Sequence, residues 1–410
     1  MNKFSVMALG LSLFALSCEP VWSQNAAPQT AVASDEPVFS ASSLLDSKIL
    51  RQPSYQIDEK VPLREHRYQF QIRSQHGTFS AAGVYMLEKR LREIHAIDEV
   101  AKMADGPVVI KEALQTLRTT PDGAETLLAD PVGTLKRLPR GFERLAADRL
   151  NRQDRRAGGS QFRHLALSLG VDPETRNPVL RNILSNVSQR QAIGSAASKY
   201  ALGAAVPGLG LLATLENFKQ TVAEKSPHEI SAEVNARLFA ANVWEPVGKE
   251  FAYSPRYTSM EKLAFLHYFD QLKGVEGIGL MVLKANKDST EADILMRLAE
   301  MRLLAELHKT STVKNVLDYG LPIAVTADDR IIGVCSVDYL LDSSSVRRSA
   351  VEFRKANPNR DLTLLTTGYP SPRAAKVFAD AQIRFQRVGY ASAAVPAVYQ
   401  ARGQSNTIRK

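Results

Sequence analysis

The chain has 410 residues, enough for two or three domains of ordinary size. Hydrophobic residues make up 44% of the sequence and charged residues 23%, which excludes a wholly disordered or low-complexity protein. The 52 Lys and Arg residues outnumber the 43 Asp and Glu residues, giving a net charge of +9, and two cysteines exclude a disulfide scaffold or a cysteine-based zinc cluster.

The first residues have the pattern of a secretory signal peptide. A basic start at Lys3 precedes an apolar run over residues 4–16, which is too short for a stable membrane span. Val21 and Ser23 occupy the −3 and −1 positions of a signal-peptidase cut. We therefore predict that residues 1–23 are removed and that the protein is exported to the periplasm.

Cys18 gives this segment a second interpretation. The sequence Ala15-Leu16-Ser17-Cys18 resembles the lipobox of bacterial lipoproteins, in which the cysteine is lipidated. Cys18 is therefore a candidate lipidation site that would anchor the protein to a membrane. The alternative, favoured by the order of Ala15 and Leu16, is a small apolar residue inside a discarded signal. The other cysteine, Cys335, lies in an apolar run and is predicted to be buried.

Composition and periodicity divide the rest of the chain into four parts. Residues 24–60 are rich in Ala, Ser, Pro and Gln, and we predict a flexible tether there. Apolar periodicity predicts a mainly helical domain over 61–311 and a small α/β domain over 312–390, followed by a basic tail over 391–410. The predicted fold class is α+β, mainly helical: a helical body with a short N-terminal hairpin and a small C-terminal α/β unit.

The helical domain is predicted to begin with a hairpin. Alternating apolar residues over 66–74 and a turn at Gly77 predict two short antiparallel strands. From Val84 onward, apolar residues recur every three or four positions, which predicts an amphipathic helix that Gly106 ends. A second helix is predicted over 108–117.

A basic segment follows over residues 136–163. It holds nine Lys and Arg residues against three acidic residues, a net charge of +6 in 28 positions. We predict that this segment contacts an anionic membrane surface, and a solvated helix face is the alternative. Aromatic residues are sparse in it, and we predict no nucleic-acid partner. The arginines that would make the contact are Arg137, Arg140, Arg144, Arg149, Arg152, Arg155 and Arg156.

The second half of the chain gives clearer signals for single elements. Residues 192–215 are rich in Gly and Ala and predict a buried, closely packed helical turn or hairpin. Thr258 with Glu261 predicts a capping box at the start of one helix, and Thr290 caps another. After residue 312, a predicted hairpin is followed by alternating helical and strand-like patterns, which indicate an α/β unit.

Four sequence phrases resemble an uncharacterised family of exported bacterial proteins. They are DPVGTLK at 130–136, PRG at 139–141, LGVDP at 169–173 and NPVL at 177–180. The resemblance covers most of the chain after residue 60 and implies a shared fold and an envelope location, but no activity. The phrases are Pro and Gly turns around helix ends, and the alternative interpretation is structural.

Residues 362–375 are similar to the strand–loop–helix of rhodanese-like domains. In that family a nucleophilic cysteine lies three residues before the loop glycine, and an arginine lies two residues after it. Here the glycine is Gly368, and the two positions hold Leu365 and Pro370. The resemblance implies a local fold, but both residues that sulfur transfer needs are replaced.

The same loop is a candidate anion-binding site. Ligands of open α/β sheets bind outside the carboxyl ends of the strands, and N–H groups, hydroxyls and a guanidinium there would suit a phosphate or carboxylate. The alternative is that Ser371 only caps the next helix. The residues of the candidate site are Thr366, Thr367, Gly368, Ser371 and Arg373.

The sequence contains no GxSxG, HExxH, Walker or GxGxxG motif, and we predict no catalytic residue, metal or cofactor. His95, Asp98 and Glu99 would offer three metal ligands on one helix face, but an ordinary surface helix is the simpler interpretation. The leading hypothesis is a non-enzymatic envelope protein that binds or scaffolds at the periplasmic membrane surface, with that surface or another envelope protein as partner. The alternative is an enzyme or ligand-binding domain for a small anionic molecule in the α/β unit.

Overall fold

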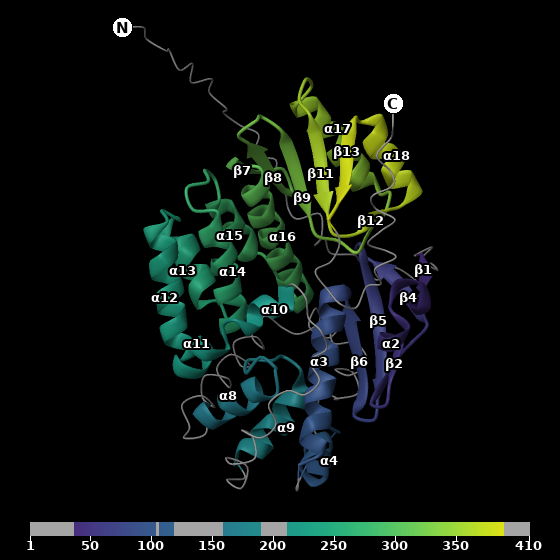
Figure 1. Cartoon of the computed structure of the whole chain (residues 1–410), viewed down its shortest axis with the longest axis vertical. Coiled ribbons are helices and arrows are strands. Elements are labelled where there is room, and N and C mark those ends of the chain that lie inside the picture. Colours follow the sequence, from purple (N-terminus) through teal and green to yellow (C-terminus); the bar gives the residue numbers. More distant parts are fainter. Residues whose placement is uncertain (1–36, 104–105, 119–158, 190–210, 389–410) are drawn as a thin grey trace, which may run out of the picture.

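The computed structural model describes residues 37–103, 106–118, 159–189 and 211–388 (Figure 1). These residues form two large β-sheets with helices around and between them, so the fold is mixed α+β.

Several predicted features lie outside the described residues: the signal peptide, Cys18, the arginines from Arg137 to Arg156 and the basic tail over 391–410. Residues 190–210, the larger part of the predicted Gly- and Ala-rich turn, also lie outside. Within the described ranges, no helix is both long and apolar enough to cross a membrane.

The N-terminal sheet is antiparallel. Its strand order is β1-β4-β5-β3-β2, and β6 pairs with β5. The predicted hairpin is confirmed as β5–β6, in which Tyr68, Phe70 and Ile72 are buried. The strands are β1 (Val38–Ser40), β2 (Arg51–Gln52), β3 (Tyr55–Ile57), β4 (Lys60–Arg64), β5 (Arg67–Ser74) and β6 (Gly77–Ala82).

Residues 38–60 belong to the folded body, so the prediction of a flexible tether over 24–60 is wrong for this stretch. It contains β1, β2, β3 and two one-turn helices, α1 (Ala41–Leu44) and α2 (Ser47–Leu50). Strand β1 pairs with β4, and Leu45 and Ile57 are buried in the core. The few apolar residues here are held by pairing with later strands, which local composition does not reveal.

Helices form the middle of the molecule. They are α3 (Val84–Ala101), α4 (Gly106–Arg118), α8 (Gly159–Ser168), α9 (Pro178–Gln189), α10 (Leu211–Glu216), α11 (Lys219–Glu224), α12 (Pro227–Ala240), α13 (Glu245–Tyr253), α14 (Ser259–Gln271), α15 (Gly279–Ala285) and α16 (Glu291–Thr310). The helices predicted from Val84 and over 108–117 are confirmed as α3 and α4. The predicted capping box of Thr258 with Glu261 starts α14, and Thr290 caps α16.

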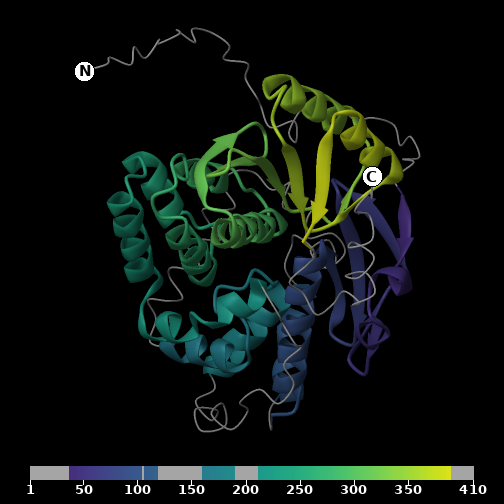
Figure 2. The ribbon, with the colours of Figure 1, turned by 45° about the horizontal axis from the view of Figure 1, so that its top comes forward.

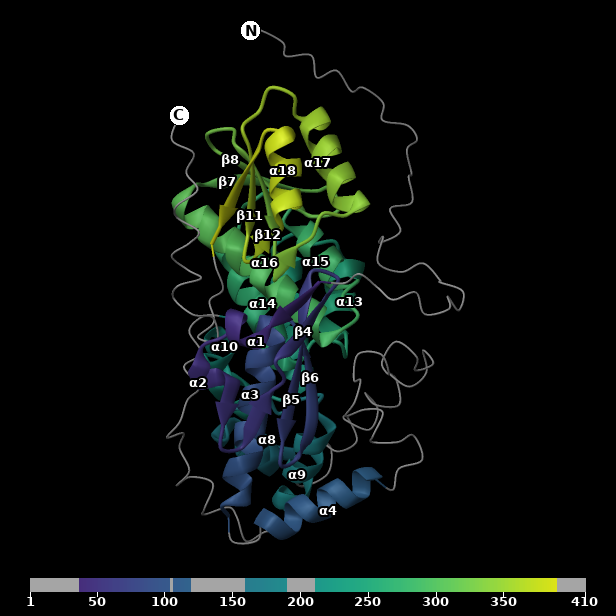
Figure 3. The same cartoon turned by 90° about the vertical axis from the view of Figure 1, so that its right-hand side faces the viewer.

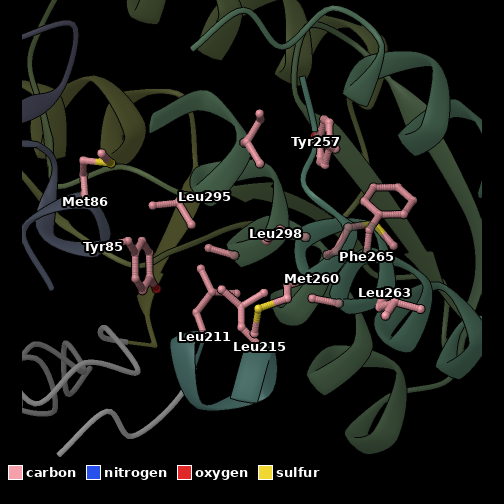
Figure 4. Packing of buried hydrophobic residues seen from close by; sticks show 14 of the residues in the cluster. Tyr85, Met86, Leu211, Leu215, Tyr257, Met260, Leu263, Phe265, Leu295 and Leu298 are labelled. Atoms are coloured by element: carbon pink, nitrogen blue, oxygen red, sulfur yellow. The ribbon is translucent and has the colours of Figure 1, made fainter. Parts of the chain in front are cut away.

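The core of the helical body lies where α14 and α16 meet α3 and α10. Figure 4 shows Met260 of α14 next to Leu211 and Leu215 of α10, with Leu298 of α16 near them. Leu211 and Leu215 are buried and end the apolar stretch predicted over 192–215. Burial of each such side chain contributes about 1.5–3 kcal/mol, so this junction holds the middle of the molecule together.

The C-terminal sheet has the strand order β13-β11-β9-β8-β7, in which β9, β11 and β13 are parallel. Helices α17 and α18 cover one face, and α16 covers the other (Figure 2). The predicted hairpin, helices and strands after residue 320 are confirmed, whereas β7 was not predicted. The elements are β7 (Val313–Asp318), β8 (Pro322–Thr326), β9 (Ile331–Cys335), β10 (Tyr339–Leu340), α17 (Ser344–Ala356), β11 (Leu362–Thr366), β12 (Tyr369–Pro370), α18 (Pro372–Asp380) and β13 (Ile383–Arg387).

Candidate ligand-binding cavity

A cavity of about 370 Å³ lies between the β5–β6 turn and helix α4. Figure 3 shows α4 at the end of the molecule remote from the C-terminal unit, close to the ends of β5 and β6. Small-molecule sites commonly have about 300–1,000 Å³ and combine apolar walls with a few polar groups. The lining residues here are Gln75, His76, Ala101, Pro107, Ile110, Lys111, Leu114 and Gln115.

The periodicity of α4 explains why one wall is half apolar and half polar. Ile110 and Leu114 are four residues apart and therefore share one row of the helix surface. Lys111 and Gln115 form the neighbouring row, which is exposed. The fully buried Val109 anchors α4 in the main core, where the helix packs against α9. The helix is thus held on one side and presents an apolar-to-polar border to the cavity.

His76 enters the cavity wall in a fixed orientation. Its Nε2 atom lies 2.9 Å from Oδ1 of Asp98 on α3, and the side chain is only 6% exposed. Burial alone would raise the pKa of Asp98, but hydrogen bonds from His76, Ser54 and Gln75 lower it below its ordinary value. Because the ionised Asp98 only accepts hydrogen bonds, Nε2 of His76 must be the donor.

Two polar groups of the cavity remain for a ligand. Among the described residues, the His76 ring makes its hydrogen bond through Nε2, which leaves Nδ1 for another partner. Lys111 lines the cavity, and no hydrogen bond or ion pair joins it to a residue that the structure describes. The site therefore combines an apolar wall, an oriented imidazole and an ammonium group that no described residue pairs with.

The metal ligands considered at His95 do not come together. His95 Nε2 lies 3.6 Å from Oε1 of Glu99, while Asp98 is bonded to His76 instead. Within the described ranges, no three His, Cys, Asp or Glu side chains are grouped as a metal ion would need.

The predicted anion-binding residues lie in the loop between β11 and α18. The Thr367 hydroxyl donates to the Val337 carbonyl over 2.8 Å and accepts from its N–H over 3.1 Å. The Ser371 hydroxyl accepts from the Ala374 N–H and caps α18. Both hydroxyls therefore make hydrogen bonds within the protein. For Ser371 this agrees with the alternative that it caps the next helix.

The remaining residues of that candidate site differ in exposure. A Cβ atom on Gly368 would lie 2.2 Å from the carbonyl oxygen of Asp338, so only glycine permits this close approach of two loops. Thr366 is buried, and its hydroxyl has no hydrogen-bond partner in the part of the chain that the structure describes. Arg373 lies on the exposed surface of α18. The predicted site is thus a packed loop with one arginine outside it.

The same sheet edge joins the C-terminal unit to the N-terminal sheet. The Tyr68 N–H donates to Oδ2 of Asp338 over 2.9 Å, and the Asp338 N–H donates to the His66 carbonyl over 3.0 Å. The Leu341 N–H donates to Nδ1 of His66 over 3.1 Å. Burial lowers the pKa of His66, which favours the neutral ring that can accept this bond. Open α/β sheets often bind ligands at this edge. Here residues of the N-terminal sheet make hydrogen bonds to it instead.

A second group of polar residues forms what we call the buried charge cluster: Lys89, Arg90, Glu93, Arg176, Glu261 and Glu291. Nζ of Lys89 lies 3.1 Å from Oε1 of Glu261 and 2.7 Å from Oε1 of Glu291. Arg90 lies 2.9 Å from Glu291, and Arg176 lies 3.2 Å from Glu261 and 3.6 Å from Glu291. The cluster joins α3, α14, α16 and the loop between α8 and α9.

Asp172 and its neighbours explain the sequence phrases at 169–173 and 177–180. Asp172 accepts from the Thr258 hydroxyl over 2.6 Å, and Glu93 of the cluster accepts from Asn177 over 3.0 Å. Burial raises the pKa of Asp172 to about 7. The cavity beside Asp172 measures about 40 Å³, room for a few water molecules but not for an organic ligand. We interpret this region as structural.

Sequence patterns placed His76 in a turn and Lys111 in a helix, but no signal connected the two. Their proximity depends on how the hairpin and α4 pack, over a sequence separation that no local period spans. The pairing of His76 with Asp98 could have been considered, because a buried polar turn residue needs a partner.

Comparison with known proteins gives no match: no family model, no curated protein and no solved structure matches the chain.

Proposed function

We propose that the protein is a binding protein of the cell envelope and that its ligand is a small molecule with an apolar body. The observation that carries the proposal is the cavity between the β5–β6 turn and α4, with Ile110 and Leu114 in its wall. The proposed envelope location rests on the signal-peptide pattern of residues 1–23.

The lining favours binding over covalent catalysis. None of the eight lining side chains is a hydroxyl, thiol or carboxylate, the groups that most often act as nucleophiles. The only free-standing thiol among the described residues, Cys335, belongs to the C-terminal sheet, and burial raises its pKa to about 12. A thiol held in its neutral form is a poor nucleophile.

A cavity-filling substitution tests the proposal. Leu114→Trp would fill the apolar wall, so we expect it to abolish the fluorescence increase of the neutral apolar probe N-phenyl-1-naphthylamine. The matched control is Val108→Trp, which adds the same side chain to an exposed position of the same helix. The melting temperatures of both variants verify that they fold. Probe binding by Leu114→Trp equal to that of the wild type and of Val108→Trp would refute the proposal.

A second function, contact with an anionic membrane surface, is supported by two exposed aromatic residues. Phe239 and Trp244 lie at the turn between α12 and α13 and are 64% and 71% exposed. Aromatic rings of this kind favour the membrane–water interface, where the arginines of the basic segment would add attraction to anionic lipid. Co-sedimentation of the full chain with anionic and neutral vesicles, with and without Phe239→Ser and Trp244→Ser, tests this. Equal binding to both lipids, or no effect of the substitutions, would contradict it.

A further inference from the structure

We infer that the ligand of the cavity carries a carboxylate head group and that His76 takes up one proton when this group binds. The inference rests on the proposed function, because it names the chemical class of the ligand for the same cavity. It is supported by Lys111 and by the His76–Asp98 pair.

Lys111 differs from Lys89 in the partners that the fold supplies. Lys89, which lines the small cavity beside Asp172, has two carboxylates within 3.1 Å. Lys111 lines a cavity nine times larger and has no such partner among the described residues. Lys111 is exposed, so its ammonium group is accessible, and a carboxylate next to it would form a charge-assisted hydrogen bond. A ligand with an apolar body against Leu114 and a carboxylate at Lys111 would match both rows of α4.

His76 would provide the second contact to the head group. Asp98 accepts from Nε2, so a carboxylate that approaches Nδ1 meets a donor only if the ring is protonated. The proton comes from solvent and stays on Nδ1, and no covalent bond other than this N–H changes. The imidazolium would then lie between Asp98 and the ligand. The Asp98 carboxylate would stabilise this cation in the way that the aspartate of a catalytic triad stabilises its histidine.

Charged groups on two elements, α3 and α4, surround the His76 ring. Asp98 faces the ring from α3 and stabilises the imidazolium, whereas Lys111 on α4 lines the same cavity and opposes a second positive charge. Gln75 is neutral, and Ser54 binds Asp98 without changing its charge. Glu99 on α3 and Lys102, which directly follows α3, form an ion pair with each other. An incoming carboxylate therefore changes the balance in favour of the protonated ring.

Competition by ligands that differ only in the head group tests the inference. Octanoate and 1-octanol have equal chain lengths, and each would be titrated against N-phenyl-1-naphthylamine bound to the full chain. We expect octanoate to displace the probe at a concentration at least tenfold lower than 1-octanol. Lys111→Met keeps the apolar stem and should abolish this advantage, while Lys111→Arg keeps the charge and should retain it. The two substitutions are matched because both keep a long, unbranched stem.

Proton uptake has its own measurement. Calorimetric titration of octanoate in two buffers of different ionisation enthalpy should show that up to one proton is taken up per ligand. The affinity for octanoate should increase as the pH falls from 8 to 6, while the affinity for 1-octanol stays constant. His76→Gln should remove the pH dependence, and Asp98→Asn serves as a second variant should His76→Gln not fold.

The outcomes separate the two proposals. If octanoate and 1-octanol compete equally, or if octanoate binds without proton uptake, the head-group inference is wrong. In that case the proposed function stands as long as Leu114→Trp still blocks both ligands. If neither ligand nor probe binds, or if Leu114→Trp has no effect on them, the proposed function itself fails and the inference with it.

Discussion

Two regions of this protein use charged side chains in opposite ways. In the buried charge cluster, Lys89 is in contact with two carboxylates that also bind Arg90 and Arg176. In the cavity, Lys111 has no partner among the described residues. Burial alone would raise the pKa of Glu291, but Lys89, Arg90 and Arg176 hold it well below its ordinary value. A charged side chain whose partners all come from the folded chain stabilises the fold. A charged side chain without such partners is available to bind a ligand.

The largest loss of stability is expected from a substitution in the buried charge cluster. Lys89→Met removes a positive charge that pairs with the buried carboxylates of Glu261 and Glu291. Removal of one partner of a buried ion pair costs about 3–5 kcal/mol of stability. Urea unfolding measures the loss. The control is Lys309→Met on α16, whose pair with Glu306 is exposed and is worth no more than about 1 kcal/mol. Equal effects of the two substitutions would mean that the cluster does not hold the helices together.

The pH dependence of Asp172 gives a second test of the same region. Burial raises its pKa to about 7, so between about pH 4 and pH 7 the folded chain binds a proton that the unfolded chain has released. This group therefore makes the free energy of unfolding decrease as the pH rises through that interval. Asp172→Asn removes the contribution, and its stability relative to the wild type should increase from pH 4 to pH 7 and then level off. Parallel stability curves would contradict the prediction.

At the junction between the two sheets, the effect of acid on the free energy of unfolding should be opposite to that at Asp172, and smaller. Burial lowers the pKa of His66, so the unfolded chain takes up a proton first as the pH falls below about 6.5. The contribution of His66 to the free energy of unfolding should therefore decrease from pH 7.5 to pH 5. His66→Asn keeps a residue that tolerates the φ of +66° but does not titrate, and its stability relative to the wild type should increase over this interval. The neighbouring charges Glu65 and Arg67 are the same in both proteins. A constant stability difference between wild type and variant would show that His66 does not contribute.

The smallest expected effect on stability is at the cavity. Lys111→Met, the same substitution as at Lys89, should change the free energy of unfolding by less than about 0.5 kcal/mol, because Lys111 is exposed and no residue that the structure describes pairs with it. Urea unfolding of Lys89→Met and Lys111→Met under identical conditions gives the sharpest form of the comparison. A loss of more than about 2 kcal/mol at Lys111 would place it among the structural charges.

Much of the secondary structure could be predicted from the sequence. The β5–β6 hairpin follows from alternation, and the starts of α14 and α16 follow from Thr258 and Thr290. These signals are local, because a capping box or a hairpin involves residues only a few positions apart. The tether prediction failed over residues 38–60 for the same reason: β1 is held by pairing with β4 and not by its own composition.

The candidate site could not be predicted in this way. The loop around Gly368 was recognised as a loop, but its packing against Asp338 and the use of the Thr367 hydroxyl became visible only in three dimensions. His76, Asp98 and Lys111 come from a turn and two helices, and each type of residue is common on protein surfaces. What distinguishes them is that His76 and Lys111 line one cavity and that Asp98 binds His76.

The sequence by itself determined the elements: a hairpin, capped helices, and strands alternating with helices at the C-terminal end. Tertiary structure alone decided which charges are paired and which face a cavity. The physical reason is the separation along the chain over which each kind of interaction acts. Backbone periodicity and capping act within one or two turns of chain, whereas the environment of a charge depends on every element packed against it, as the contrast between Lys89 and Lys111 shows.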